Sequence, residues 1–184
     1  VDENSDRTFI SNSLPKHFGG LNNTFNYKNF ELNVFFEWSY GAEIFNLGKI
    51  ALEGLSNNNN ISKEFYDNRW TPENQSNEYG DFRASNGLPG GNTTYRFASS
   101  YYVEDASYLR LRNVTLGYNL PKAWIGKIGL KGAKFYVTGN NLWLLTKYSG
   151  YDPDVSFSDP LFSGFDRISY PRVRSFIIGA NINL

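Results

Sequence analysis

The stretch RSFIIGANINL (residues 174–184) alternates between apolar and polar side chains. From residue 175 onward, the residues of one parity are Phe176, Ile178, Ala180, Ile182 and Leu184. The other parity is polar or glycine except for Ile177. A period of two indicates a β-strand with one apolar and one polar face. What the apolar face contacts, a protein core or lipid, decides which class of protein this is.

Four earlier segments repeat this alternation. The clearest is FELNVFFEWSY, where every second residue from Phe30 to Tyr40 is apolar. Only Lys28 and Asn29 separate it from the segment before, which predicts a two-residue hairpin turn. The strands expected from the five segments cover residues 17–27, 30–40, 107–120, 133–145 and 172–184.

The third of these segments changes parity in its middle. Leu109 and Leu111 fall on one parity, and Val114 and Leu116 fall on the other. Because a slip of one residue turns every side chain to the opposite face, we expect a β-bulge near residues 112–113. Without a bulge, Arg112 would face the apolar side, which costs roughly 2–4 kcal/mol near the middle of a bilayer.

The connections between the expected strands differ greatly in length. Those over residues 41–106 and 147–171 are long, and the one over residues 121–132 is modest. Antiparallel strands place both long connections at one end, which is typical of the extracellular loops of outer-membrane barrels. Within the first long connection, the spacing from Ile44 predicts a helix, and a second helix is expected after Ser62.

Aromatic residues lie near the ends of the apolar faces. Those expected at the two membrane–water interfaces are Tyr27, Trp38, Tyr40, Tyr118 and Trp143, with Trp143 matching Trp38 on its own strand. Arg172 and Arg174 share the parity of Phe176, so both are expected to point outward, with Arg174 at the rim of the apolar band. The alternative is a β-sandwich whose aromatic residues fill a core.

The composition excludes several classes of protein. Eighteen basic and eighteen acidic side chains give no net charge, which argues against a nucleic-acid partner. Cysteine is absent, so disulfides and cysteine-ligated metals are excluded. No run of about 18 apolar residues predicts a membrane helix. The mean hydropathy of −0.48 still permits a barrel, in which only alternate residues face lipid.

Four stretches in series resemble the C-terminal end of the SusC/RagA family of TonB-dependent outer-membrane transporters. They are FGGLNNTFNYKNFELNVFFEWSYGAEIFN (18–46), YLRLRNVTLGYNLP (108–121), KFYVTGNNLWLLTKYSGYDPD (134–154) and SYPRVRSFIIGANINL (169–184). The resemblance implies an all-β fold, the last five strands of a 22-stranded antiparallel transmembrane barrel with two long extracellular loops. The plug domain would lie outside this chain. Because such chains usually end in an aromatic residue, a last residue or two after Leu184 is expected to be missing.

The same resemblance implies a function in the outer membrane of Bacteroidetes. Family members import glycans or peptides, driven by the TonB complex, which would act through the missing N-terminal part. The implied partners are a SusD-like surface lipoprotein, outer-membrane lipid and the remaining barrel strands, which five strands need in order to close. The alternative function is that of a soluble, aromatic-rich β-sandwich that binds glycans.

No pattern in the chain predicts catalysis, a cofactor or a metal. His17 is the only histidine, and no nucleophile motif accompanies it. The stretch DPDVSFSD (152–159) gathers three acids but lacks the spacing of an EF-hand, so we expect a turn. The chain is therefore not expected to be an enzyme.

Aromatic residues are dense in the first long connection. The candidates for contact with substrate or with the lid protein are Tyr66, Trp70, Tyr79, Phe82, Tyr95 and Tyr101. Aromatic rings among polar side chains suit the C–H faces and hydroxyls of sugars, and they suit equally a loop that packs on itself or on a lid.

Overall fold

The computed structural model describes residues 8–53, 60–76, 79, 100–154 and 163–183. The chain divides into two compact units. The sheet unit consists of Pro15–Ala42, Ala106–Lys147 and Tyr170–Leu184, and the loop unit of Val1–Leu14, Glu43–Asp105 and Tyr148–Ser169. Each unit is described by itself below.

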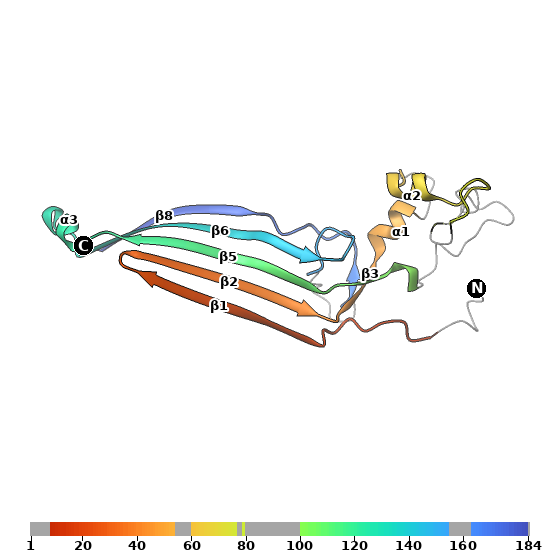
Figure 1. The fold of residues 1–184 in the computed structure, drawn as a ribbon, viewed down its shortest axis with the longest axis horizontal. Coiled ribbons are helices and arrows are strands. Elements are labelled where there is room, and N and C mark those ends of the chain that lie inside the picture. The colour runs from red at the N-terminus through yellow and green to blue at the C-terminus, as the bar shows by residue number, and fades with distance from the viewer. Residues whose placement is uncertain (1–7, 54–59, 77–78, 80–99, 155–162, 184) are drawn as a thin grey trace. The chain divides into compact units, whose positions relative to one another are not determined.

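The sheet unit is built on one antiparallel sheet of five long strands (Figure 1). The strands are β1 (His17–Tyr27), β2 (Phe30–Tyr40), β5 (Tyr108–Asn119), β6 (Gly132–Thr146) and β8 (Ser175–Asn183), paired in that order. The predicted antiparallel sheet of these segments is confirmed. Strands β1 and β8 are the edges, each with one neighbour in this sheet.

The register gathers the apolar residues of all strands on one face. Leu32 pairs with Leu116, Leu116 with Val137, and Val137 with Ile178. These side chains are open to the surroundings, since Val137 is 47% and Ile178 82% exposed. A soluble β-sandwich would bury this face, so the exposure argues against the sandwich.

The opposite face is polar, and its side chains bond across the strands. The cross-strand hydrogen bonds join Asn33 to Thr24 at 2.9 Å, Thr115 to Thr138 at 2.8 Å, Asn113 to Asn140 at 2.9 Å and Asn140 to Ser175 at 3.0 Å. Lys134 Nζ and Glu31 Oε2 form an ion pair of 2.8 Å. Such a face suits a water-filled interior.

The predicted bulge in β5 is confirmed at Arg112. In the pairing with β2, Asn113 faces Phe35 and Leu111 faces Phe36, so Arg112 has no partner in the register. Its Nη1 donates to Glu37 Oε2 at 2.7 Å, on the polar face. The bulge therefore moves a guanidinium from the apolar to the polar side.

A second irregularity, which the sequence analysis missed, lies beside the first. Asn140 and Trp143 of β6 pair with Asn113 and Leu111, so Asn141 and Leu142 are left out of the register. Asn141 has a φ of 51°, in the left-handed region. Two extra residues preserve parity, and alternation alone therefore gave no sign of them.

The expectation that Arg172 points outward is wrong. Strand β8 begins at Ser175, so the alternation does not extend back to residue 172. Arg172 instead lines a hollow of about 440 Å³ together with Asn140 and Ser175 of the polar face. The outward direction of Arg174, which is exposed, stays a prediction.

The short and the long connections between the strands lie at opposite ends of the sheet. The hairpin turn between β1 and β2 has two residues, as predicted, and Lys28 adopts a φ of 52° there. The β5–β6 connection contains α3 (Lys122–Ile125) and η4 (Gly126–Ile128). Both long connections begin at the other end, where Ser39, Tyr108 and Thr146 are in register.

The loop unit contains a small sheet that alternation did not predict. Strand β3 (Glu43–Asn46) lies between β4 (Val103–Asp105), which is antiparallel to it, and β7 (Phe165–Asp166), which is parallel. The remaining elements are α1 (Leu47–Glu53), α2 (Lys63–Asn68) and η3 (Ser100–Tyr102). No helix in the described ranges is both long and apolar enough to cross a bilayer.

Both predicted helices of the loop unit are present, but the first begins later than predicted. The first predicted helix is confirmed over Leu47–Glu53 as α1, but its start at Ile44 is wrong, because Ile44 belongs to β3. The Asn46 side chain accepts from Lys49 N at 2.9 Å, and this cap fixes the start of α1. The helix after Ser62 is confirmed, with the Ser62 hydroxyl accepting from Phe65 N at 3.1 Å.

Replacing Val137 by arginine should block assembly of the full-length protein in the membrane. Val137 lies at mid-strand on the apolar face, where an arginine costs roughly 2–4 kcal/mol in lipid. The matched control is Tyr136→Arg, on the polar face, where the new side chain can still cover Gly179 as the tyrosine does. Heat-modifiable migration of the membrane fraction on a gel measures assembly. Equal outcomes for the two variants would contradict the assignment of faces.

Candidate functional site

The described part of the loop unit contains a hollow of about 430 Å³, here called the loop pocket. Segments from β3, α1, α2 and β4 contribute to it, together with residues after β6 and around β7. Its charged side chains are Lys49, Glu53, Glu64, Glu104 and Asp166. Four carboxyl groups against one ammonium make the pocket acidic.

A buried amide ties three separate segments together at the loop pocket. Asn46 Nδ2 donates to Glu104 Oε1 at 3.1 Å and to Ser149 Oγ at 3.2 Å. Ser149 in turn donates from its backbone N and its hydroxyl to Glu104, both at 2.8 Å. With its oxygen capping α1, the Asn46 amide uses both donors and its acceptor. This network holds β3, β4 and the chain after β6 in one arrangement.

A second buried pair fixes the neighbourhood of β7. Tyr148 donates from its hydroxyl to Asp166 Oδ2 at 2.6 Å, and Ser169 N donates to Asp166 Oδ1 at 2.9 Å. Burial raises the pKa of Tyr148, and the adjacent Asp166 carboxylate raises it further. The phenol therefore stays protonated and serves as a hydrogen-bond donor.

Glu53, like Asp166, is a buried carboxyl group of the loop pocket. Its Oε2 accepts from the Tyr101 hydroxyl at 2.8 Å, and Lys49 Nζ lies 4.1 Å from the centre of the Tyr101 ring. Burial raises the pKa of Glu53; the Tyr101 hydrogen bond and Lys49 oppose this, while Glu64 and Glu104 add to it. Glu64 and Glu104 thus disfavour the charged form of Glu53.

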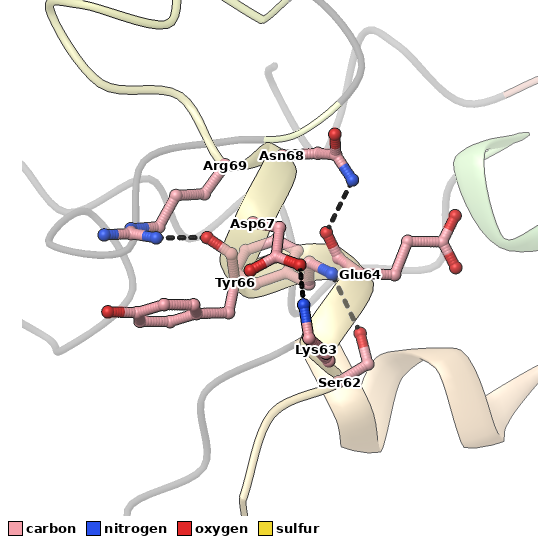
Figure 2. A network of polar contacts seen from close by, with 8 residues as sticks. Ser62, Lys63, Glu64, Tyr66, Asp67, Asn68 and Arg69 are labelled. Atoms are coloured by element: carbon pink, nitrogen blue, oxygen red, sulfur yellow. Dashed lines mark hydrogen bonds and ion pairs between the residues drawn. The ribbon is translucent and has the colours of Figure 1, made fainter.

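Helix α2, which forms one wall, is stabilised by contacts within its own turn. Figure 2 shows the ion pair of Lys63 with Asp67, the Ser62 cap, and Asn68 Nδ2 donating to the Glu64 carbonyl at 2.9 Å. The Arg69 guanidinium lies 4.1 Å from the centre of the Tyr66 ring and also donates to the Tyr66 carbonyl. A six-residue helix is marginal alone, so these contacts matter for its persistence.

Of the four predicted contact aromatics that the structure describes, Tyr79 and Tyr101 lie at the loop pocket. Tyr79 lines the loop pocket, donates to Glu64 Oε1 at 2.9 Å, and packs its ring against Phe65. Tyr101 packs beside the pocket through its bond to Glu53, Tyr66 is exposed on α2, and Trp70 is half-buried after it. Phe82 and Tyr95 lie outside the described residues. Contact of any of the six with substrate or lid stays a prediction.

The sequence analysis missed Tyr151, which lines the loop pocket and is 68% exposed. The one local signal is its position between Gly150 and the acidic turn that follows. In that turn, Asp152 Oδ1 accepts from Asp154 N at 3.0 Å. Among the described residues, no group of three or more His, Asp or Glu side chains is placed to hold a metal ion.

The five predicted interface aromatics all lie on the apolar face of the sheet. Tyr27, Tyr40 and Trp143 are exposed. Trp38 covers Gly19, where a Cβ would lie 2.7 Å from the indole ring, and Tyr118 packs on Phe30. In the register, Trp38 is level with Leu145 rather than with Trp143, which is two residues farther along the face. Their contact with a membrane interface stays a prediction.

Comparison with known proteins gives consistent relatives by sequence. No protein-family model matches the chain. TonB-dependent receptor P3 of Formosa agariphila is 35% identical over 184 residues, covering 97% of this chain and 17% of the receptor. TonB-dependent receptor SusC of Bacteroides thetaiotaomicron is 32% identical over 166 residues, covering 89% of this chain and 14% of SusC.

Solved structures agree on the fold. The RagAB peptide transporter matches with a TM-score of 0.75 and 24% identity, over 94% of this chain and 17% of the matched one. The RagAB peptide importer in its closed-closed state matches with a TM-score of 0.73 and 24% identity, over 96% of this chain and 18% of the matched one. The chain thus spans less than a fifth of the length of the relatives that it matches. Over nearly its whole length, the chain is thus similar to a segment of TonB-dependent receptors, SusC among them.

Proposed function

We propose that this chain forms the last five strands and two extracellular loops of an outer-membrane importer. The observation that carries the proposal is the continuous apolar face, on which Phe135, Phe176 and Ile178 are exposed. Water is a poor solvent for such a face, whereas hydrocarbon is a good one. The exposure of the same residues is what disfavours the soluble glycan-binding sandwich.

The edges of the sheet support closure with strands from outside this chain. Strands β1 and β8 each present one side without a neighbour in the five-stranded sheet. Unpaired backbone groups are costly in lipid, so only a closed barrel satisfies them there. Further strands joining β1 and β8 would complete the barrel, and 22 strands are typical of plugged outer-membrane transporters.

The proposed activity is TonB-dependent import of glycans or peptides together with a SusD-like lipoprotein. The names TonB-dependent receptor SusC and RagAB peptide importer, borne by proteins that this chain resembles, support TonB-dependent import and a peptide cargo respectively. The loop pocket supports it chemically, because its carboxylates accept hydrogen bonds from sugar hydroxyls and from peptide N–H groups alike. In this proposal the chain supplies wall and loops and performs no catalytic step.

The location is tested on the full-length protein in its own cells. We expect it in the outer-membrane fraction, soluble only with detergent, and migrating faster on a gel before boiling than after. A closed barrel keeps its shape in cold detergent, which causes the difference in migration. Recovery as a soluble monomer without detergent would refute the proposal and favour the glycan-binding module.

The role of the loop pocket is tested by replacing Tyr151 with alanine. Loss of an exposed ring that lines the pocket should weaken cargo binding about 2–10-fold, while assembly stays normal. Uptake of labelled oligosaccharides and of labelled peptides by cells measures the effect. Tyr66→Ala is the matched control, because Tyr66 is 54% exposed and does not line the pocket. A loss with Tyr66→Ala alone would place the contact surface on α2 instead.

A further inference from the structure

The middle of the chain carries an unusual concentration of positive charge. No aspartate or glutamate occurs between residues 106 and 151, whereas the same stretch has five lysines and two arginines. Arg112 and Lys134 are paired with Glu37 and Glu31 on the polar face. Three other lysines of the stretch, Lys122, Lys127 and Lys131, stand in the β5–β6 connection.

The β5–β6 connection holds these lysines in defined positions. Ile125 is buried, and its carbonyl accepts from Leu130 N at 3.1 Å. Lys131 N donates to the Asn183 carbonyl at 3.0 Å, which ties the end of the connection to β8. In contrast, the indole of Trp124 is 63% exposed. We name Lys122, Trp124, Lys127 and Lys131 together the basic end.

The side chains of the basic end are available for a partner. All three lysines are exposed, and within the described ranges none of them makes an ion pair or a side-chain hydrogen bond. Lys122 and Lys131 also line a hollow of about 650 Å³, which Ala133 and Ile182 of the apolar face share with Lys134 and Asn181 of the polar face. The site thus joins positive charge to apolar surface.

We propose that the basic end is a docking surface for anionic phospholipids in the membrane leaflet that it faces. Charge complementarity assigns the phosphates to the lysines, and continuity with the exposed sheet face assigns the acyl chains to the apolar residues. A tryptophan indole is suited to the head-group layer, where its ring is partly apolar and its N–H finds acceptors. This inference rests on the proposed membrane barrel, and the short-turn end would then face the periplasmic leaflet.

The test uses the detergent-purified full-length transporter, titrated with phosphatidylglycerol and separately with phosphatidylcholine. Native mass spectrometry measures the apparent affinity of the first bound lipid. We expect the wild type to bind phosphatidylglycerol more tightly than phosphatidylcholine. The combined variant Lys122→Gln, Lys127→Gln and Lys131→Gln should weaken the affinity for phosphatidylglycerol about 10-fold or more. Affinity for phosphatidylcholine should not change, since it carries no net charge.

The controls separate this inference from the proposal on which it rests. Lys16→Gln, Lys63→Gln and Lys147→Gln combined remove the same charge from other exposed positions and should change the affinity by less than about twofold. Trp124→Ala should weaken the affinity for both lipids, because the indole is uncharged and contributes through its ring. Equal affinities of wild type and the first triple variant for phosphatidylglycerol, with heat-modifiable migration intact, would overturn the lipid site alone. Absence of heat-modifiable migration in the wild type would refute the barrel itself.

Discussion

A β-sheet satisfies its backbone hydrogen bonds within its own plane, which leaves its two faces free to meet different solvents. In this chain the two faces are chemically opposite, and the apolar one is exposed. Leaving a large aliphatic or aromatic side chain in water forgoes about 1.5–3 kcal/mol relative to burial. Phe25, Phe135 and Ile178 are among the many such residues that are exposed. We propose lipid contact and closure into a barrel as the arrangement that meets this one constraint.

The placement of charge obeys the same constraint. Every Asp, Glu, Lys and Arg within the five long strands lies on the polar face; they are Glu31, Glu37, Arg110, Arg112 and Lys134. Four follow from alternation, and Arg112 reaches that face only through the bulge. The ion pair of Arg112 with Glu37 is then a consequence of the bulge, since two opposite charges share one face. The irregular register of β5 is therefore required by the two-faced sheet rather than being a defect in it.

The sequence alone predicts the long strands well, because alternation is a local property that each strand displays by itself. The bulge at Arg112 was predictable for the same reason, since one extra residue switches the parity. The irregularity at Asn141 and Leu142 was hidden, because two extra residues leave parity unchanged. The small sheet and the loop pocket escaped prediction because they depend on contacts distant in sequence, such as Asn46 with Glu104 and Ser149. Strands of two to four residues carry too few positions for a pattern.

The side chains of the two units differ in how specifically they can recognise what they contact. The outer face of the sheet distinguishes only apolar from polar surroundings, so many apolar substitutions there are equivalent. The loop pocket is specific, because Asn46 and Asp166 are buried with hydrogen-bond partners of fixed geometry. A pocket ordered in this way before binding avoids much of the entropy cost of arranging its groups around a ligand. We therefore expect the selectivity that this chain contributes to reside in the loop unit, whereas the sheet supplies the wall of the proposed barrel.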